Sequence, residues 1–344
     1  MNIAEELERS VELGQFLASR PVARARLGAT SHRVIHRQGS SALRYFPPAR
    51  GATVRQPLFI STPLINGWAI LDLLPGRSLV GALSAVGVPV YLLDWGVPGA
   101  SDRGLSLGAL IDQRLPRALS RATRHARAEG HLEADGLPAA LGYCVGGTFL
   151  AMSLARHPGL VDRMALLATP IDFSEGGLLN TWADPERFPV DALIDDLGAF
   201  PKELMREAFA WLRPMAQLSK WRSLHARIHE HRFAETWAAL ERWSTEGVDF
   251  PGEAYRAYVH GCYFDNALMG DSWMLDGRPL QLKAATIPAR VFAATGDHIC
   301  PPAAANGLLA AWGGPVEAEL LPGGHVSVCL SAALPARLLS WIDA

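Results

Sequence analysis

Residues 142–146 read Gly-Tyr-Cys-Val-Gly, and this pattern constrains the fold more than any other part of the chain. It follows an apolar run at 138–141 and precedes a helical pattern at 148–156, so it predicts a strand, a sharp turn and a helix. Gly142 and Gly146 allow such a turn because a side chain at either position would collide with neighbouring backbone. The turn raises Cys144 above the sheet edge, where the positive end of the following helix favours its thiolate. A buried cysteine in an ordinary tight turn is the alternative interpretation.

A cysteine nucleophile needs a general base and a group that orients this base. In the α/β-hydrolase fold, where the nucleophile occupies this kind of turn, the chain order is nucleophile, acid, histidine. A buried strand is predicted at 289–295 and is followed by Asp297, and a second apolar run at 316–321 leads to His325 in a glycine-rich loop. A single loop aspartate or histidine is usually only a solvated side chain. The shared order and the strand-end positions nevertheless predict a triad of Cys144, Asp297 and His325.

Acyl transfer also requires two donors for the oxyanion of the tetrahedral intermediate. The backbone N–H of Val145, directly after the nucleophile, is the expected first donor. The second is expected in the loop 62–67, which follows a predicted strand at 57–61. We assign it to the N–H of Ile65, with Asn66 as the alternative. An ordinary connecting loop would show the same sequence.

The predicted strands alternate with helical patterns, which indicates one α/β fold with a mostly parallel sheet flanked by helices. The alternation stops at 171–285, which is expected to be an inserted, mainly helical cap. Six of the ten tryptophans lie there, and most of them are expected in the cap core. The expected organisation is an N-terminal helical or extended segment at 1–50, a hydrolase core at 51–170 and 286–344, and the cap at 171–285. The six predicted strands are 57–61, 88–94, 138–143, 164–168, 289–295 and 316–321.

Taken together, these motifs resemble those of the polyhydroxyalkanoate synthases, and especially their short catalytic subunits that work with a second subunit. The resemblance covers nearly the whole chain from about residue 35. Two cysteines depart from the family pattern, Cys300 in the aspartate segment and Cys329 four residues after His325. The segments that carry the resemblance are 62–73, 77–80, 90–96, 142–147, 169–174, 296–302 and 322–325.

The resemblance implies that the protein polymerises 3-hydroxyacyl-coenzyme A, with a short-chain substrate such as 3-hydroxybutyryl-coenzyme A, and releases coenzyme A. Cys144 would carry the acyl group or the growing chain as a thioester. His325 would deprotonate Cys144 or the incoming 3-hydroxyl group, and Asp297 would orient His325. Cysteine suits this chemistry because its thioester remains reactive toward an alcohol and a thiolate is a good leaving group.

The same resemblance implies an accessory synthase subunit, a homodimer or hetero-oligomer, and a polyester granule surface as partners. The coenzyme A thioester is then the substrate, and neither a cofactor nor a metal is expected. Two other functions remain open: a cysteine hydrolase of the dienelactone-hydrolase or thioesterase type, and a granule-associated paralogue with altered catalysis. The large cap argues against the first of these, and the complete triad argues against the second.

Composition excludes several other classes of protein. The 344 residues include 32 basic and 34 acidic ones, and this near balance does not favour a nucleic-acid surface. The four cysteines have no C-x-x-C spacing, which suits a reducing cytoplasm, where the protein is expected free or on granules. No apolar run approaches the roughly 18–20 residues of a membrane span.

Two helical patterns carry residues that could form further sites. Ile3, Leu7 and Val11 mark an amphipathic helix whose stripe either packs on its own domain or binds a partner or granule surface. His225 and His229 have the i, i+4 spacing of metal ligands, but no third ligand is evident, so a solvated helix face is expected.

Overall fold

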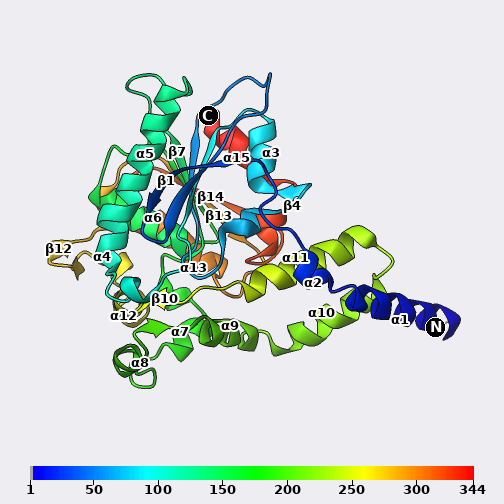
Figure 1. Ribbon diagram of the computed structural model, residues 1–344. Coiled ribbons are helices and arrows are strands. Elements are labelled where there is room, and N and C mark those ends of the chain that lie inside the picture. The colour runs from blue at the N-terminus through cyan, green and yellow to red at the C-terminus, as the bar shows by residue number, and fades with distance from the viewer. Residues whose placement is uncertain (1–2) are drawn as a thin grey trace.

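The computed structural model describes residues 3–344, and an eight-stranded sheet forms its centre (Figure 1). The apolar runs predicted as strands all lie in this sheet, and five neighbouring strands from β3 to β14 are parallel, as is β6 beside β3. The α/β-hydrolase fold expected from the sequence is therefore confirmed. In spatial order the strands are β1 (Arg33–Gln38), β2 (Ser41–Phe46), β6 (Val90–Asp94), β3 (Leu58–Ser61), β7 (Ala139–Tyr143), β8 (Met164–Leu167), β13 (Ala289–Ala294) and β14 (Val316–Leu321).

Two of these strands were missed by the sequence analysis. β1 and β2 form an antiparallel hairpin, and β2 adds antiparallel to β6, so residues 33–46 extend the sheet beyond the predicted core. Gly39 turns the hairpin at a φ of 58°. β1 is an edge strand whose six residues are all exposed or half-buried, so it carries no apolar run to predict it.

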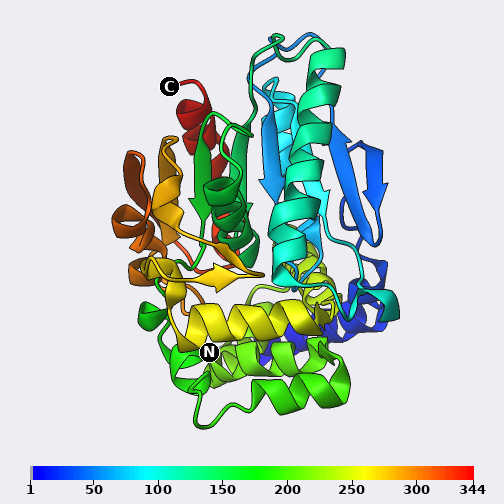
Figure 2. The same cartoon turned by 90° about the vertical axis from the view of Figure 1, so that its left-hand side faces the viewer.

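Helices cover both faces of the sheet. Figures 1 and 2 show α5 and α6 on one face, and Figure 1 shows α3 and α15 on the other. All residues of α6 from Val145 to Ala155 are buried, because this helix lies between the sheet and the outer helix α5. The helices of the core are α3 (Leu79–Ala85), α4 (Leu107–Ala109), α5 (Leu115–Ala128), α6 (Val145–Arg156), α13 (Pro302–Asn306), α14 (Leu308–Ala311) and α15 (Leu334–Ile342).

The segment between β8 and β13 is mainly helical and lies across the end of the sheet, as Figure 2 shows. Aromatic rings join it to the core: Phe149 of α6 contacts Phe250 and Tyr258 edge-to-face, at ring-centroid distances of 6.2 and 5.9 Å. Its helices are α7 (Leu178–Trp182), α8 (Val190–Leu197), α9 (Lys202–Trp211), α10 (Pro214–Ala226), α11 (His231–Thr245) and α12 (Gly252–Tyr258). Three two-stranded ribbons complete the fold: β4 (Asp72–Leu74) with β5 (Arg77–Ser78), β9 (Ala199–Phe200) with β10 (Phe250–Pro251), and β11 (Met274–Leu275) with β12 (Arg278–Pro279).

The prediction that most tryptophans of this segment are core residues was wrong. Trp237 and Trp243 are buried, but Trp211 is 66% exposed, and Trp182 and Trp221 are also exposed. Apolar composition could not distinguish the buried tryptophans from the exposed ones. Helices α9 and α10 carry large apolar residues on their exposed side as well.

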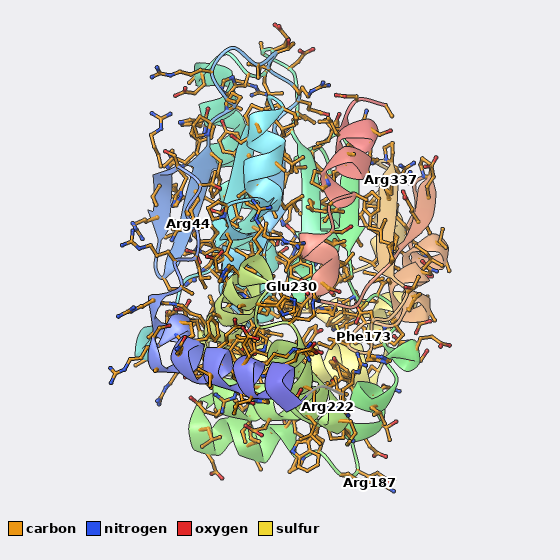
Figure 3. The ribbon with its side chains drawn as sticks, turned by 90° about the vertical axis from the view of Figure 1, so that its right-hand side faces the viewer. Arg44, Phe173, Arg187, Arg222, Glu230 and Arg337 are labelled. Carbon is orange, nitrogen blue, oxygen red and sulfur yellow. The ribbon has the colours of Figure 1, made fainter. Side chains whose placement is uncertain are left out.

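The N-terminal helix α1 (Ile3–Ala18) lies against α10, and α2 (Pro21–Arg24) lies against α11 (Figure 3). The packing uses Leu13 and Phe16, which contact the buried cluster around Trp237. The predicted stripe takes no part in this packing, since Leu7 and Val11 are exposed; the side chain of Ile3 lies outside the described residues.

Asp102 is buried, and its ionisation makes the stability of the fold depend on pH. Burial raises the pKa of its carboxyl group, but hydrogen bonds from the Gly99 N–H and from Arg114, both 3.0 Å long, outweigh burial and lower the pKa below its usual value. The ionised carboxylate thus stabilises the fold above the unfolded-state pKa of about 4, and this stabilisation disappears as the pH falls through the folded-state value. We expect Asp102→Asn to lower the free energy of unfolding by about 1–3 kcal/mol at neutral pH. Urea denaturation at several pH values should show this difference shrinking in acid, and a difference independent of pH would contradict the assignment.

Candidate active site

The predicted site residues follow four parallel strands at their carboxyl ends. Ile65 follows β3, Cys144 follows β7, Asp297 follows β13 and His325 follows β14. The chain passes from β3 to β6 on one side and later to β7 on the other, so the strand order reverses at β3. In open α/β sheets, ligands bind in the crevice at such a reversal.

The turn at Cys144 has the strained geometry that the glycine pattern predicted. Cys144 has a φ of 53° and a ψ of −139°, and its N–H donates to the carbonyl oxygen of Leu167 at 3.0 Å. A Cβ atom on Gly142 would lie 2.3 Å from the Cα atom of Gly147, and one on Gly146 would lie 2.2 Å from a carbonyl oxygen of the loop after β3. Both positions therefore require glycine by close approach of backbone. The turn places Cys144 at the start of α6.

His325 and Asp297 form a buried pair. The Nδ1 atom of His325 lies 2.7 Å from Oδ2 of Asp297. The other carboxylate oxygen accepts the N–H groups of Ile299 and Cys300, each at 2.9 Å, so the Asp297 side chain is held on both sides. Because Nδ1 is engaged by the carboxylate, the Nε2 atom of His325 is available to Cys144.

Cys144 lies beside His325, and both residues line the same two cavities. Burial by itself lowers the pKa of His325. Interaction with Cys144 and with the Asp297 carboxylate outweighs burial and raises this pKa to about 10. The arrangement thus favours a protonated imidazole beside the Cys144 side chain.

The two residues predicted to supply the oxyanion donors line one cavity with Cys144. Val145 is the first residue of α6, and the first N–H groups of a helix have no partner within the helix. Within residues 3–344, neither the Val145 N–H nor the Ile65 N–H donates a hydrogen bond to protein. Asn66, the alternative, forms an isolated bridge with Gly247.

Two cavities meet at Cys144 and His325. The first, of about 140 Å³, is lined mainly by apolar and aromatic side chains, among them Phe250 and Tyr258. The second, of about 470 Å³, is lined partly by charged side chains of α9, α10 and α11. The residues common to both cavities are Ile65, Cys144, Met205, Phe209, Ile299 and His325.

Several residues at the site were missed by the sequence analysis. Met205 and Phe209 of α9 lie at the junction of the two cavities, and Lys202 and Arg206 line the larger cavity. These positions form one side of a helix, at the spacing i, i+3, i+4, i+7. Such a spacing predicts that this side faces the protein, but it does not show that a cavity lies there.

His225, considered as a metal ligand, contacts the N-terminal helix instead. Its ring lies 3.2 Å from the Ser10 hydroxyl group and 3.6 Å from Glu6. No group of three or more potential metal ligands is found among residues 3–344.

The strand order, the strained cysteine turn and the buried His325–Asp297 pair define a protein of the α/β-hydrolase class. Residues 72–328 match the family described as the alpha/beta hydrolase fold, and the chain belongs to this family. Among solved structures, the putative non-heme bromoperoxidase BpoC of Mycobacterium tuberculosis has a TM-score of 0.52 at 14% identity, covering 91% of this chain and 97% of that one. At this identity the likeness shows the fold alone.

The curated relatives are more specific. The chain is 29% identical to the poly(3-hydroxyalkanoate) polymerase subunit PhaC of Allochromatium vinosum, over 95% of this chain and 91% of the relative. It is also 29% identical to the protein of that name from Haloferax mediterranei, over 90% of this chain but only 62% of that relative's length. The resemblance to polyhydroxyalkanoate synthases predicted from the motifs is confirmed, and it supports an enzyme. Within the part of the chain that the structure describes, no helix is long and apolar enough to cross a bilayer.

Proposed function

We propose that this chain is the catalytic subunit of a polyhydroxyalkanoate synthase, which polymerises 3-hydroxyacyl-coenzyme A and releases coenzyme A. The observation that carries the proposal is the buried His325–Asp297 pair beside Cys144, at the junction of an apolar and a charged cavity. The relatives named as poly(3-hydroxyalkanoate) polymerase subunits support the substrate class. A short-chain substrate such as 3-hydroxybutyryl-coenzyme A suits the small volume of the apolar cavity.

The proposed reaction has two acyl transfers. The Cys144 thiolate attacks the thioester carbonyl of the substrate, and the N–H groups of Val145 and Ile65 stabilise the oxyanion. Coenzyme A leaves as a thiol with the proton held by His325, and Cys144 retains the acyl group. His325 then accepts a proton from a 3-hydroxyl group, which attacks the Cys144 thioester and lengthens the ester chain. Asp297 holds the imidazole in orientation for both transfers.

The segment that covers the site supports transfer to an alcohol rather than to water. Residues 171–285 contribute aromatic and aliphatic side chains to the apolar cavity, and such a lining excludes the water that would hydrolyse a thioester. We propose that this segment is the cap of the enzyme.

The charged cavity suits the phosphate groups of coenzyme A. Lys202 and Arg206 of α9 line it, and the Lys202 ammonium group has no ion pair within residues 3–344. We expect Lys202→Ala and Arg206→Ala each to raise KM for the acyl-coenzyme A about tenfold with little change in kcat, because they would remove a charge-assisted contact to phosphate. Steady-state kinetics at two ionic strengths would measure this. Lys283→Ala serves as the control, because Lys283 pairs with Asp271 and lines neither cavity, and an unchanged KM in both α9 variants would contradict the placement of coenzyme A.

The remaining expectations concern partners and location. Both relatives are named as subunits, which supports an accessory synthase subunit for this chain as well. The exposed Leu7 and Val11 on α1 offer an apolar surface for such a subunit, for a second copy of the chain or for a polyester granule. We propose that the protein acts in the cytoplasm or on granules, needs no metal or cofactor, and binds no nucleic acid.

The proposal is tested by following thiol release from 3-hydroxybutyryl-coenzyme A and turbidity in parallel. Thiol release accompanied by insoluble polyester is the expected result, with the rate compared in the presence and absence of a candidate accessory subunit. Thiol release that yields only free 3-hydroxybutyrate would identify a hydrolase. No release from substrates of several chain lengths, with the accessory subunit present, would favour a paralogue with altered catalysis.

A further inference from the structure

Tyr143, the last residue of β7, lies directly beneath the histidine loop. It is the residue immediately before the nucleophile, and only 1% of its surface is exposed. Its ring packs with Val328 and Cys329 in the core cluster on the α3 and α15 side of the sheet. Neighbouring residues of a strand point to opposite sides, so the elbow that presents Cys144 above the sheet also fixes the direction of the Tyr143 side chain.

The Tyr143 hydroxyl group bonds to the main chain of the histidine loop. It donates to the main-chain carbonyl oxygen of His325 at 3.2 Å. The Cys329 thiol, in the 3₁₀-helical turn η8 (Ser327–Leu330) that follows His325, belongs to the same buried cluster as Tyr143.

The ring of Tyr143 supports the imidazole as well. The two ring centroids lie 5.6 Å apart with an interplanar angle of 34°. Burial, followed by the neighbouring thiols of Cys329 and Cys144, raises the pKa of the Tyr143 phenol well above its usual value, so the phenol keeps its proton. It is therefore a permanent hydrogen-bond donor over the working pH range.

The histidine loop begins with two glycines, Gly323, with a φ of 118°, and Gly324. Main-chain hydrogen bonds hold both glycines, from the Gly296 N–H at 2.7 Å and the Val328 N–H at 3.0 Å. At His325 itself, the imidazole is held through Nδ1, and the carbonyl oxygen is held by the Tyr143 hydroxyl group. These two contacts together set the position of the imidazole beside Cys144.

We infer that Tyr143 is a positioning residue, whose hydroxyl group fixes His325 against Cys144. This inference rests on the Cys144–His325 pair of the proposed function but not on the identity of the substrate.

The test is the pH dependence of alkylation of Cys144 by iodoacetamide, which needs no substrate. Cys144 is the only one of the four cysteines that is not buried, so the reaction reports on this thiol. In the native enzyme the raised pKa keeps His325 protonated in mild acid, so its cation lies beside Cys144 during the reaction. Each variant changes one side chain and leaves the other titratable groups around the Cys144–His325 pair in place. These groups are Tyr143, Tyr258, Tyr263, Asp297, Cys300 and Cys329.

Tyr143→Phe removes the hydroxyl group and retains the ring. We expect the ratio of the alkylation rate at about pH 6 to that at about pH 9 to fall about tenfold, and kcat to fall by a similar factor with KM unchanged. Tyr91→Phe is the matched control, because Tyr91 is a buried tyrosine of the same sheet whose hydroxyl group is hydrogen-bonded to His125 at 3.0 Å, away from the site. Tyr91→Phe should lose stability and keep the native alkylation ratio.

Tyr143→Met keeps the inference testable if Tyr143→Phe does not fold, because it also removes the hydroxyl group and keeps an apolar side chain, and it should lower the ratio at least as far. Cys329→Ala is a second control, since Cys329 is buried in the same cluster as Tyr143, and it should keep the native ratio. A native ratio and a native kcat in Tyr143→Phe, with only its stability lowered, would overturn the inference. Absence of polymerisation by an enzyme that shows these alkylation ratios would overturn the proposed function alone.

Discussion

Cys144→Ala is expected to abolish thiol release and polymer formation, with a fall in rate of at least about 10,000-fold. The reason is chemical. The proposed pathway forms a covalent bond between Sγ of Cys144 and the acyl carbon, and alanine offers no atom to replace it. The fold should tolerate the change, because alanine is smaller than cysteine and adds no contact to the strained turn. A small loss of stability is expected, because the positive φ of 53° at this position is unfavourable for alanine.

Mass spectrometry of the intact protein provides the decisive measurement. Incubation with 3-hydroxybutyryl-coenzyme A should add one or more 3-hydroxybutyryl units to the native chain and none to Cys144→Ala. Cys262→Ala is the matched control, because Cys262 is buried in the segment above the site and burial raises its thiol pKa well above the usual value. Thiol release that persists in Cys144→Ala would show that another group is the nucleophile, and the proposed mechanism would be wrong.

The order of the site residues along the chain was predictable because each follows a parallel strand. β7 and β13 are buried apolar runs, while the edge strand β14 buries only Leu321, and parallel strands bring their carboxyl ends to one edge of the sheet. Residues separated by more than 150 positions could therefore be placed together from strand ends alone. The close approach at Gly142 and Gly146 was also predictable, since the elbow geometry leaves no room for a side chain.

The lining of the cavities was not predictable in the same way. Met205 and Phe209 belong to a helix that is exposed on its other side, as Trp211 shows. Which side of such a helix faces the core depends on how the whole segment packs, and no local pattern encodes this. The edge strand β1 was missed for a related reason. It buries little surface, so its sequence needs no apolar run that would identify it as a strand.

Tyr143 illustrates a third limit. The motif drew attention to the glycines and the cysteine, while the residue between Gly142 and Cys144 could have been any large buried side chain. Its hydroxyl group matters only because the chain after β14 brings His325 to it from 182 positions away. A hydrogen bond of this kind is set by tertiary packing and leaves no trace in sequence spacing.

Asp297→Asn is expected to lower kcat about 1,000- to 10,000-fold while leaving the fold nearly intact. The amide oxygen of asparagine can still accept the N–H groups of Ile299 and Cys300, so the turn survives. Facing His325, however, the variant presents an NH₂ group in place of a carboxylate oxygen. Nδ1 must then accept rather than donate, the proton moves to Nε2, and His325 can no longer take a proton from Cys144 or from a 3-hydroxyl group.

The same substitution should change the pH profile of Cys144 reactivity. Two of the effects that raise the pKa of His325 come from Asp297, its hydrogen bond and its charge, and both are lost in Asp297→Asn. With the opposing effect of burial unchanged, the imidazolium becomes less stable, so alkylation of Cys144 should weaken in mild acid and kcat should fall at every pH. Asp112→Asn is the matched control, since Asp112 also pairs with a histidine, His157, at 2.9 Å, but outside the site. An Asp297→Asn enzyme that kept the native rate and profile would show that the imidazole is oriented without the carboxylate.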